Sequence, residues 1–239
     1  MQTEYSVEEV KELARHGASD SALIGMRHDL ADFTALTFTQ VGQELHATGH
    51  IFGSDRRDGS SPFGNGSDEM VAVSLLFRIA GQLTSAISDL FRGERAYAAA
   101  ALIRQMVEIE YLAWAFQARD KDAQAWLRST RAEREKFFSP RKLREAALGK
   151  FRSKDYGYHC ELGGHPVPGS ALLLGNDPTA PQLLLSDLLG HTGRIWDNFL
   201  DWSHGNEFAF PLHRRKEAML EKYSSWKAQD ILTNLPPPP

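Results

Sequence analysis

Residues 96–116 place the strongest constraint on the fold of this chain, because they form a helix that is apolar around nearly its whole circumference. The strongly polar side chains in this stretch are those of Arg104, Gln105, Glu108 and Glu110. A helix without a polar face has no side to turn toward water, so other elements of the protein must enclose it. We therefore expect this helix to lie at the centre of a helical bundle.

Other helical segments supply the neighbours that such a helix needs. Apolar residues recur at the spacing of one helix face over residues 19–50 and 68–92, and further helices are predicted over residues 182–204 and 211–233. Gly93 leaves only a short break between the second of these segments and the central helix. A connection this short predicts that the two helices are antiparallel neighbours.

Shorter helices are predicted near the N-terminus and in the middle of the chain. Ser6 and Glu9 have the spacing of a capping box, so a helix is expected to begin there. One charged helix is predicted over residues 120–138, and the Ser-Pro pair at residues 139–140 begins another. Residues 155–166 form a short piece interrupted by glycine.

The fold class follows from this pattern of elements. No segment shows the alternation of β-branched residues between turn signals that is typical of a strand. The predicted fold is all-α, a single bundle of about seven helices with no significant sheet, and residues 1–233 are expected to form one domain. Glycine and proline predict a flexible loop over residues 53–67, a second loop over residues 167–181 and a proline-rich tail over residues 234–239.

Composition excludes several classes of protein. The single cysteine, Cys160, excludes a disulfide scaffold, and the absence of a Cys-x-x-Cys pair excludes a thiolate zinc site. The glycine-rich phosphate loop and the Gly-x-Ser-x-Gly sequence of serine hydrolases are both absent. The N-terminal residues lack the basic start and apolar run of a signal peptide, and no stretch reaches the ~18 apolar residues of a membrane span. We expect a cytoplasmic protein without a membrane contact.

Charge is distributed unevenly along the chain. The formal net charge is −4, but residues 119–154 carry twelve Lys or Arg against five Asp or Glu, so this basic segment is at +7 and the remainder at −11. Such a division indicates an anionic partner, and RNA is the candidate. The candidate nucleic-acid-binding residues are Arg141, Lys142, Arg144, Lys150 and Arg152. The alternative is that these side chains form a solvated helical face.

Arg104 and Glu108 form the most informative charged pair in the sequence. They lie four residues apart on the central helix, so they share one face of it. A charge retained in an apolar interior has to be matched by another group. Two interpretations stay open: a structural ion pair that determines helix register, or an Arg/Glu pair facing a pocket.

Two groups of histidines are weak candidates for a metal site. His46 and His50 have the four-residue spacing in which two imidazoles share a helix face, but no third ligand is apparent near them. His159, Glu161 and His165 lie close together in sequence, yet on a helix His159 and Glu161 point about 160° apart. We therefore expect no metal site and no cofactor.

Two short stretches carry a family resemblance. Residues 102–108 (LIRQMVE) and residues 158–166 (YHCELGGHP) resemble a bacterial and phage-associated family of uncharacterised helical proteins that look distantly HEPN-like. The resemblance covers about residues 70–170 and implies the helical fold more than an activity. It implies that Arg104, Glu108 and His165 are the candidate catalytic residues, and we expect His165 to lie within hydrogen-bond reach of Arg104 or Glu108.

Three functions are compatible with these observations. The first is a helical binding or regulatory module, related to defence or stress, whose partner is another protein or a second copy of the chain. The second is a metal-independent ribonuclease or RNA-binding protein, because Arg152 and His159 match the loosest form of the Arg-x(4 to 6)-His motif of HEPN ribonucleases. The third is a helical-bundle metalloprotein that uses His46 and His50.

Overall fold

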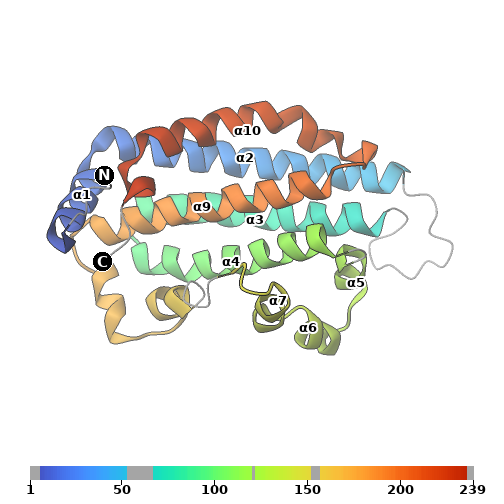
Figure 1. Cartoon of the computed structure of the whole chain (residues 1–239), viewed down its shortest axis with the longest axis horizontal. Helices are drawn as coiled ribbons and strands as arrows, with labels where there is room; N and C mark the ends of the chain where they lie inside the picture. Colours follow the sequence, from blue (N-terminus) through green and yellow to red (C-terminus); the bar gives the residue numbers. More distant parts are fainter. Residues whose placement is uncertain (1–5, 53–66, 120–121, 152–156, 236–239) are drawn as a thin grey trace.

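The structure is a computed structural model that describes residues 6–52, 67–119, 122–151 and 157–235. Within these ranges it is helical and contains no strand, which confirms the all-α fold class. Five long helices run along the length of the bundle (Figure 1). They are α2 (Ser21–Phe52), α3 (Asp68–Arg92), α4 (Ala96–Ala118), α9 (Thr179–Trp202) and α10 (Phe210–Gln229).

The capping box predicted at the N-terminus is present. Helix α1 (Val7–Ser19) begins where the Ser6 hydroxyl accepts a hydrogen bond from the backbone N–H of Glu9. The Glu9 carboxylate in turn accepts the backbone N–H of Ser6 at 2.7 Å. Two amide groups that a helix start leaves free are thus satisfied by one pair of side chains.

Helices α2 and α3 lie in close contact because each carries a glycine where the other approaches. A Cβ atom on Gly81 would lie 2.6 Å from Thr39 Oγ1 and 3.0 Å from the carbonyl oxygen of Ala35. A Cβ atom on Gly42 would lie 2.6 Å from Cγ of Arg78. Larger residues at these two positions would force the helices apart, so the glycines set the spacing of this pair.

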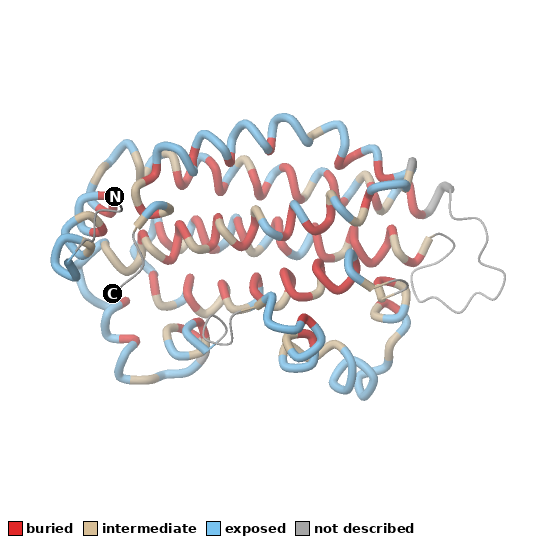
Figure 2. The backbone as a smooth tube through the Cα atoms, in the orientation of Figure 1, coloured by how far each residue is buried: buried red, intermediate tan, exposed pale blue. Residues whose placement is uncertain are grey.

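Helix α4 is enclosed as its sequence predicts. It contacts α3 and α9 along its length and is covered further by the shorter elements around it. Buried residues occur on the inward-facing turns of all the long helices (Figure 2). An aromatic cluster fills the centre, where the ring centroids of Phe38 and Phe77 are 5.1 Å apart and those of Phe77 and Phe199 are 4.7 Å apart.

The basic segment departs from the predicted single helix over residues 120–138. It forms α5 (Asp122–Arg128), α6 (Arg131–Phe137) and α7 (Pro140–Ala146). The division occurs because Thr130 and Glu133 make a second capping box, which begins a new helix at Arg131. The predicted count of about seven helices is therefore not confirmed.

The connections between α7 and α9 are more ordered than predicted. Residues Cys160–Gly164 of the glycine-interrupted piece form a π-helix, η1. Residues Pro168–Leu173, inside the predicted loop over residues 167–181, form a 3₁₀-helix, η2. Helix α9 also begins earlier than residue 182, because the Asp177 carboxylate accepts the backbone N–H of Thr179 at 2.9 Å.

The ends of the remaining predicted segments lie close to those observed. Short 3₁₀-helices, η3 (Glu207–Ala209) and η4 (Ile231–Asn234), lie on either side of α10. Residues 53–66, from the predicted flexible loop, and residues 236–239, from the predicted tail, lie outside the described residues.

Helix α3 is the one helix in the described ranges that is long and apolar enough to cross a membrane by length and composition. Its most apolar window has a mean hydropathy of 1.6, but 61% of that window is buried inside the protein. The core helix of a bundle passes the same test, so this helix is weak evidence for a membrane span.

Candidate functional site

Polar side chains meet inside the otherwise apolar interface between α4 and α9. Helix α4 contributes Glu110, which is 4% exposed. Helix α9 contributes Asp187, His191 and Arg194, whose spacing of four and three residues places them on one helix face. Because α4 and α9 are in contact along their length, this face meets Glu110.

A third element adds His159 to this group. His159 lies directly before η1 and is 2% exposed. The π-helix can press against α4 because Gly163 carries no side chain: a Cβ atom there would lie 2.4 Å from the backbone of Ala100 and Ala101. The close contact between η1 and α4 holds the imidazole of His159 in the interior.

Three potential donor atoms converge between these elements. Nε2 of His159 lies 3.0 Å from Oδ2 of Asp187 and 3.2 Å from Nε2 of His191. The distance from His191 Nε2 to Asp187 Oδ2 is 3.7 Å. These residues are the one group of His, Cys, Asp or Glu in the described ranges whose ligand atoms gather closely enough to hold a metal ion.

Glu110 orients the imidazole of His191 from the other side. His191 Nδ1 lies 2.6 Å from Glu110 Oε2, and since a carboxylate only accepts, Nδ1 carries the proton. Arg194 donates from Nε to the second carboxylate oxygen at 2.8 Å. Its Nη2 also lies 2.8 Å from His191 Nδ1, but two donors do not bond, so Glu110 is the acceptor for both residues. Nε2 of His191 is left to face His159 and Asp187.

The charges in this cluster support one another. Burial alone would lower the pKa of His191, but the carboxylates of Asp187 and Glu110 outweigh burial and raise that pKa to about 9. Burial raises the pKa of Asp187 and Glu110, yet the neighbouring imidazoles, and Arg194 beside Glu110, hold both carboxyl pKa values below their usual range. His191 is therefore an imidazolium at neutral pH, and both acids are charged.

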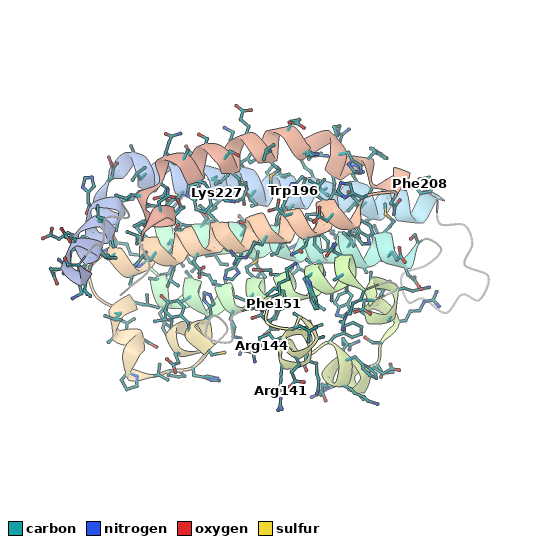
Figure 3. The ribbon with its side chains drawn as sticks, viewed as in Figure 1. Arg141, Arg144, Phe151, Trp196, Phe208 and Lys227 are labelled. Atoms are coloured by element: carbon teal, nitrogen blue, oxygen red, sulfur yellow. The ribbon has the colours of Figure 1, made fainter. Side chains whose placement is uncertain are left out.

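The cluster opens into a cavity of about 870 Å³. Asp187 is 37% exposed by its side chain, whereas both histidines are buried, so solvent reaches the cluster from the carboxylate side. Tyr158 and Phe151 line the cavity, and Lys150 lies beside Phe151 at the end of the basic segment. Phe151 is placed beneath α4 (Figure 3), where its ring centroid lies 4.3 Å from that of Tyr111.

The candidate catalytic residues taken from the family resemblance lie on α4 and directly after η1. The Arg104 and Glu108 side chains are each 34% exposed, with 3.6 Å between Nη2 and Oε1, so they are a half-buried pair. His165 is exposed, and its predicted hydrogen bond to Arg104 or Glu108 stays a prediction. None of the three lines the cavity.

The candidate nucleic-acid-binding residues are divided between two places. Arg141 and Lys142 of α7 both pair with Glu145, at 2.8 Å and 2.9 Å, and Arg141 points away from the bundle (Figure 3). Arg144 is half-buried on the same helix. Lys150 lines the cavity, and Arg152 lies outside the described residues.

The histidine pair proposed from its spacing on one helix stays a prediction. His46 is half-buried on α2 and has an interaction partner, while the side chain of His50 lies outside the described residues. The geometry of this pair is therefore not tested, and the His159, Asp187 and His191 cluster is a separate site.

The sequence contains a signal for the part of this cluster that lies on α9, and the predictions above do not use it. Residues 187–194 (DLLGHTGR) place an acid, a histidine and an arginine on one face of a mainly apolar helix. That pattern resembles the Arg104 and Glu108 spacing that we did single out. The sequence groups His159 with Glu161 and His165, which are both exposed, whereas His159 is buried. The correct partners come from a helix about thirty residues later.

Comparison of the chain with models of protein families, with curated proteins and with solved structures found no match. The HEPN-like resemblance of residues 70–170 therefore stays a prediction.

Proposed function

We propose that the protein binds one divalent transition-metal ion through His159 Nε2, Asp187 Oδ2 and His191 Nε2. The observation that carries this proposal is the convergence of two imidazole nitrogens and one carboxylate oxygen within 3.7 Å of one another. The proposal departs from the expectation of no metal site and belongs to the third alternative from the sequence, the helical-bundle metalloprotein, but it uses other residues than His46 and His50.

The distances between the three atoms suit a bound ion. Metal bonds of about 2.0 to 2.1 Å separate neighbouring ligands by about 3.3 Å in a tetrahedral site and by about 2.9 Å in an octahedral site. The separations of 3.0, 3.2 and 3.7 Å lie around these values. An ion therefore requires only small side-chain movements.

Protons alone satisfy this arrangement poorly. If His159 donates from Nε2 to Asp187, its Nε2–H and the Nε2–H of the His191 imidazolium face each other as two donors at 3.2 Å. If His191 donates from Nε2 to His159, then His159 and Asp187 face each other as two acceptors at 3.0 Å. A single cation at the centre attracts all three atoms at once, and it displaces the proton from His191 Nε2 when it binds.

The surroundings favour a site with a free coordination position. Two imidazoles and one carboxylate suit zinc, iron and other first-row ions, and three protein ligands leave room for water or another ligand. Glu110 supplies the outer carboxylate that commonly orients a metal-bound histidine. The three residues line the 870 Å³ cavity, so an ion held by them would supply Lewis-acid chemistry to a ligand bound there.

The test is the metal content and metal affinity of the purified protein. We expect one zinc or cobalt ion per chain by elemental analysis, and loss of that ion in His159→Gln, Asp187→Asn and His191→Gln. The exposed residues Asp201 and His204 offer matched controls, so Asp201→Asn and His204→Gln are expected to bind as the parent does. A parent protein that stays folded by circular dichroism and holds no stoichiometric ion would overturn the proposal.

The second candidate function is the metal-independent ribonuclease or RNA-binding protein predicted from the sequence. The observation that favours it is the presence of two imidazoles and Lys150 at one cavity, since proton transfer and phosphate binding need such groups. RNA cleavage that persists in a chelator and disappears in His159→Gln would support it. A protein that neither retains RNA at low salt nor cleaves it would contradict this function. The binding or regulatory module stays a prediction.

A further inference from the structure

The cavity beside the proposed ion has a charge that identifies the class of its ligand. This inference rests on the proposed metal site. With neutral imidazoles as ligands, a divalent ion together with Lys150 and Arg194 outweighs the charges of Glu110 and Asp187. The loaded cavity is then positive by two charges, so it attracts an anion.

Lys150 is the cation in this cavity that remains available. Arg194 is held by Glu110 at 2.8 Å, and the basic side chains of α7 that the structure describes are paired or half-buried. Lys150 is exposed, and the described residues provide it with no ion-pair partner. Because an ammonium group binds phosphate as a point charge, Lys150 suits the outer oxygens of an anion whose inner oxygen contacts the ion.

The backbone places Lys150 at the cavity by an uncommon turn. Leu148 has φ +48° and Gly149 has φ +90°, and the N–H of Lys150 closes the turn on the carbonyl of Ala147 at 3.0 Å. Leu148 is 93% exposed, so packing of its own side chain does not favour this left-handed conformation. The ring of Phe151, packed against Tyr111, holds the end of the turn in place.

The volume and the lining residues of the cavity indicate what the rest of the ligand is. A volume of about 870 Å³ is in the range that encloses an organic molecule rather than an inorganic anion. Tyr158 is half exposed, and with Phe151 it presents aromatic surface to the cavity. Aromatic walls favour a planar or apolar group.

We propose that the cavity binds an organic monophosphate of about nucleotide size, with its phosphate between the metal ion and the Lys150 ammonium group. The organic part lies against Tyr158 and Phe151. Adenosine monophosphate is a suitable probe of this class, and adenosine, inorganic phosphate and acetate separate the contributions of charge, size and phosphate geometry.

The experiment follows the visible absorption of the cobalt-loaded protein as each probe is added. Adenosine monophosphate is expected to change the cobalt spectrum saturably, inorganic phosphate to do so more weakly, and adenosine to have no effect. Lys150→Met is expected to weaken binding of adenosine monophosphate about tenfold, while cobalt affinity stays unchanged. Lys136→Met, an exposed lysine of the same basic segment, is the matched control and keeps the parent affinity.

The outcomes separate this inference from the proposed function. A normal cobalt spectrum that adenosine monophosphate does not change, or that acetate changes equally well, overturns the ligand class and leaves the metal site standing. Equal affinity in the Lys150 and Lys136 variants overturns the role of Lys150. Failure to bind cobalt overturns the metal site and, with it, this inference.

Discussion

Glu110 illustrates how one buried side chain gives direction to another. Its carboxylate accepts the Nδ1 proton of His191 and is held in turn by Arg194, so the imidazole ring has one fixed orientation. The same acid looked like one of four polar residues on an apolar helix when only the sequence was considered. Its partner on α9, and therefore its role, depends on the packing of two helices.

At this scale we predict that Glu110→Gln weakens metal binding about 10- to 100-fold, because the amide is a poorer acceptor for the His191 proton. Competition with a calibrated chelator measures the affinity. The exposed Glu161, two residues after His159, is the control, and Glu161→Gln should bind metal as the parent does. Equal affinity in the two variants would show that Glu110 does not support the site.

The elements around the site are held by close contacts that only particular residues permit. Gly163 lets η1 rest on the backbone of α4, and this contact carries His159 into the interior. Tyr223 of α10 connects three long helices: its hydroxyl lies 2.7 Å from Thr192 of α9 and 3.0 Å from Thr34 of α2. The Gly163 contact fixes the distance between η1 and α4, and the Tyr223 hydrogen bonds fix the distances from α10 to α9 and α2.

Gly163→Ala is expected to displace η1 and to reduce both stability and metal affinity. The added methyl group would lie 2.4 Å from the backbone of Ala100 and Ala101, a contact that costs about 1 to 3 kcal/mol to relieve. Thermal unfolding and cobalt titration measure the two effects. Gly169→Ala, where nothing lies within 4 Å of the added atom, should change neither quantity. An unchanged cobalt affinity in Gly163→Ala would separate η1 from the site.

Because Tyr223 is buried, we predict that the free energy of unfolding falls in alkaline solution. Burial raises the pKa of Tyr223 to about 12, against about 10 in an unfolded chain. Between these values the unfolded chain loses a proton that the folded protein keeps, so the stability present below pH 10 is lost as pH rises toward 12. Urea unfolding should show a decline of about 1.4 kcal/mol per pH unit above pH 10 that Tyr223→Phe lacks. Equal slopes would contradict this assignment.

At the scale of the whole molecule, one buried ion pair joins the beginning of the bundle to its end. Arg27 of α2 contacts both carboxylate oxygens of Asp230 at 2.6 Å, and Trp226 donates to the same carboxylate at 2.8 Å. The remaining Arg27 donors reach Gln182 of α9 and the carbonyl of Gly17 in α1. The turn after α10 is thereby fixed beside α1 at one end of the bundle (Figure 1).

Breaking this pair should affect the entire fold. Asp230→Asn is expected to cost about 3 to 5 kcal/mol of unfolding free energy, because it leaves the fully buried Arg27 without a counter-charge. Urea unfolding measures the loss. The exposed pair of Glu8 and Lys11 is the control, and Lys11→Met should change stability by less than about 1 kcal/mol. A double variant, Arg27→Met with Asp230→Leu, should lose less than the two single variants added together.

The sequence by itself determined the long helices, the capping box at Ser6 and the enclosure of α4 by other elements. These features follow from local periodicity, from capping chemistry and from the burial that an apolar helix demands. Periodicity did not reveal the division of the basic segment, because the capping box at Thr130 interrupts an otherwise helical pattern.

Only the tertiary structure decided which polar residues meet. Arg104 and His165 carry the family resemblance, yet neither lines the cavity, while His159 and Asp187 share no local pattern and converge. The reason is that a donor set drawn from α9 and the start of η1 depends on helix rotation and spacing, which glycines such as Gly163 determine through close contact. The residue types and their spacing along one helix do not determine the distance between two helices, so they could not predict this cluster.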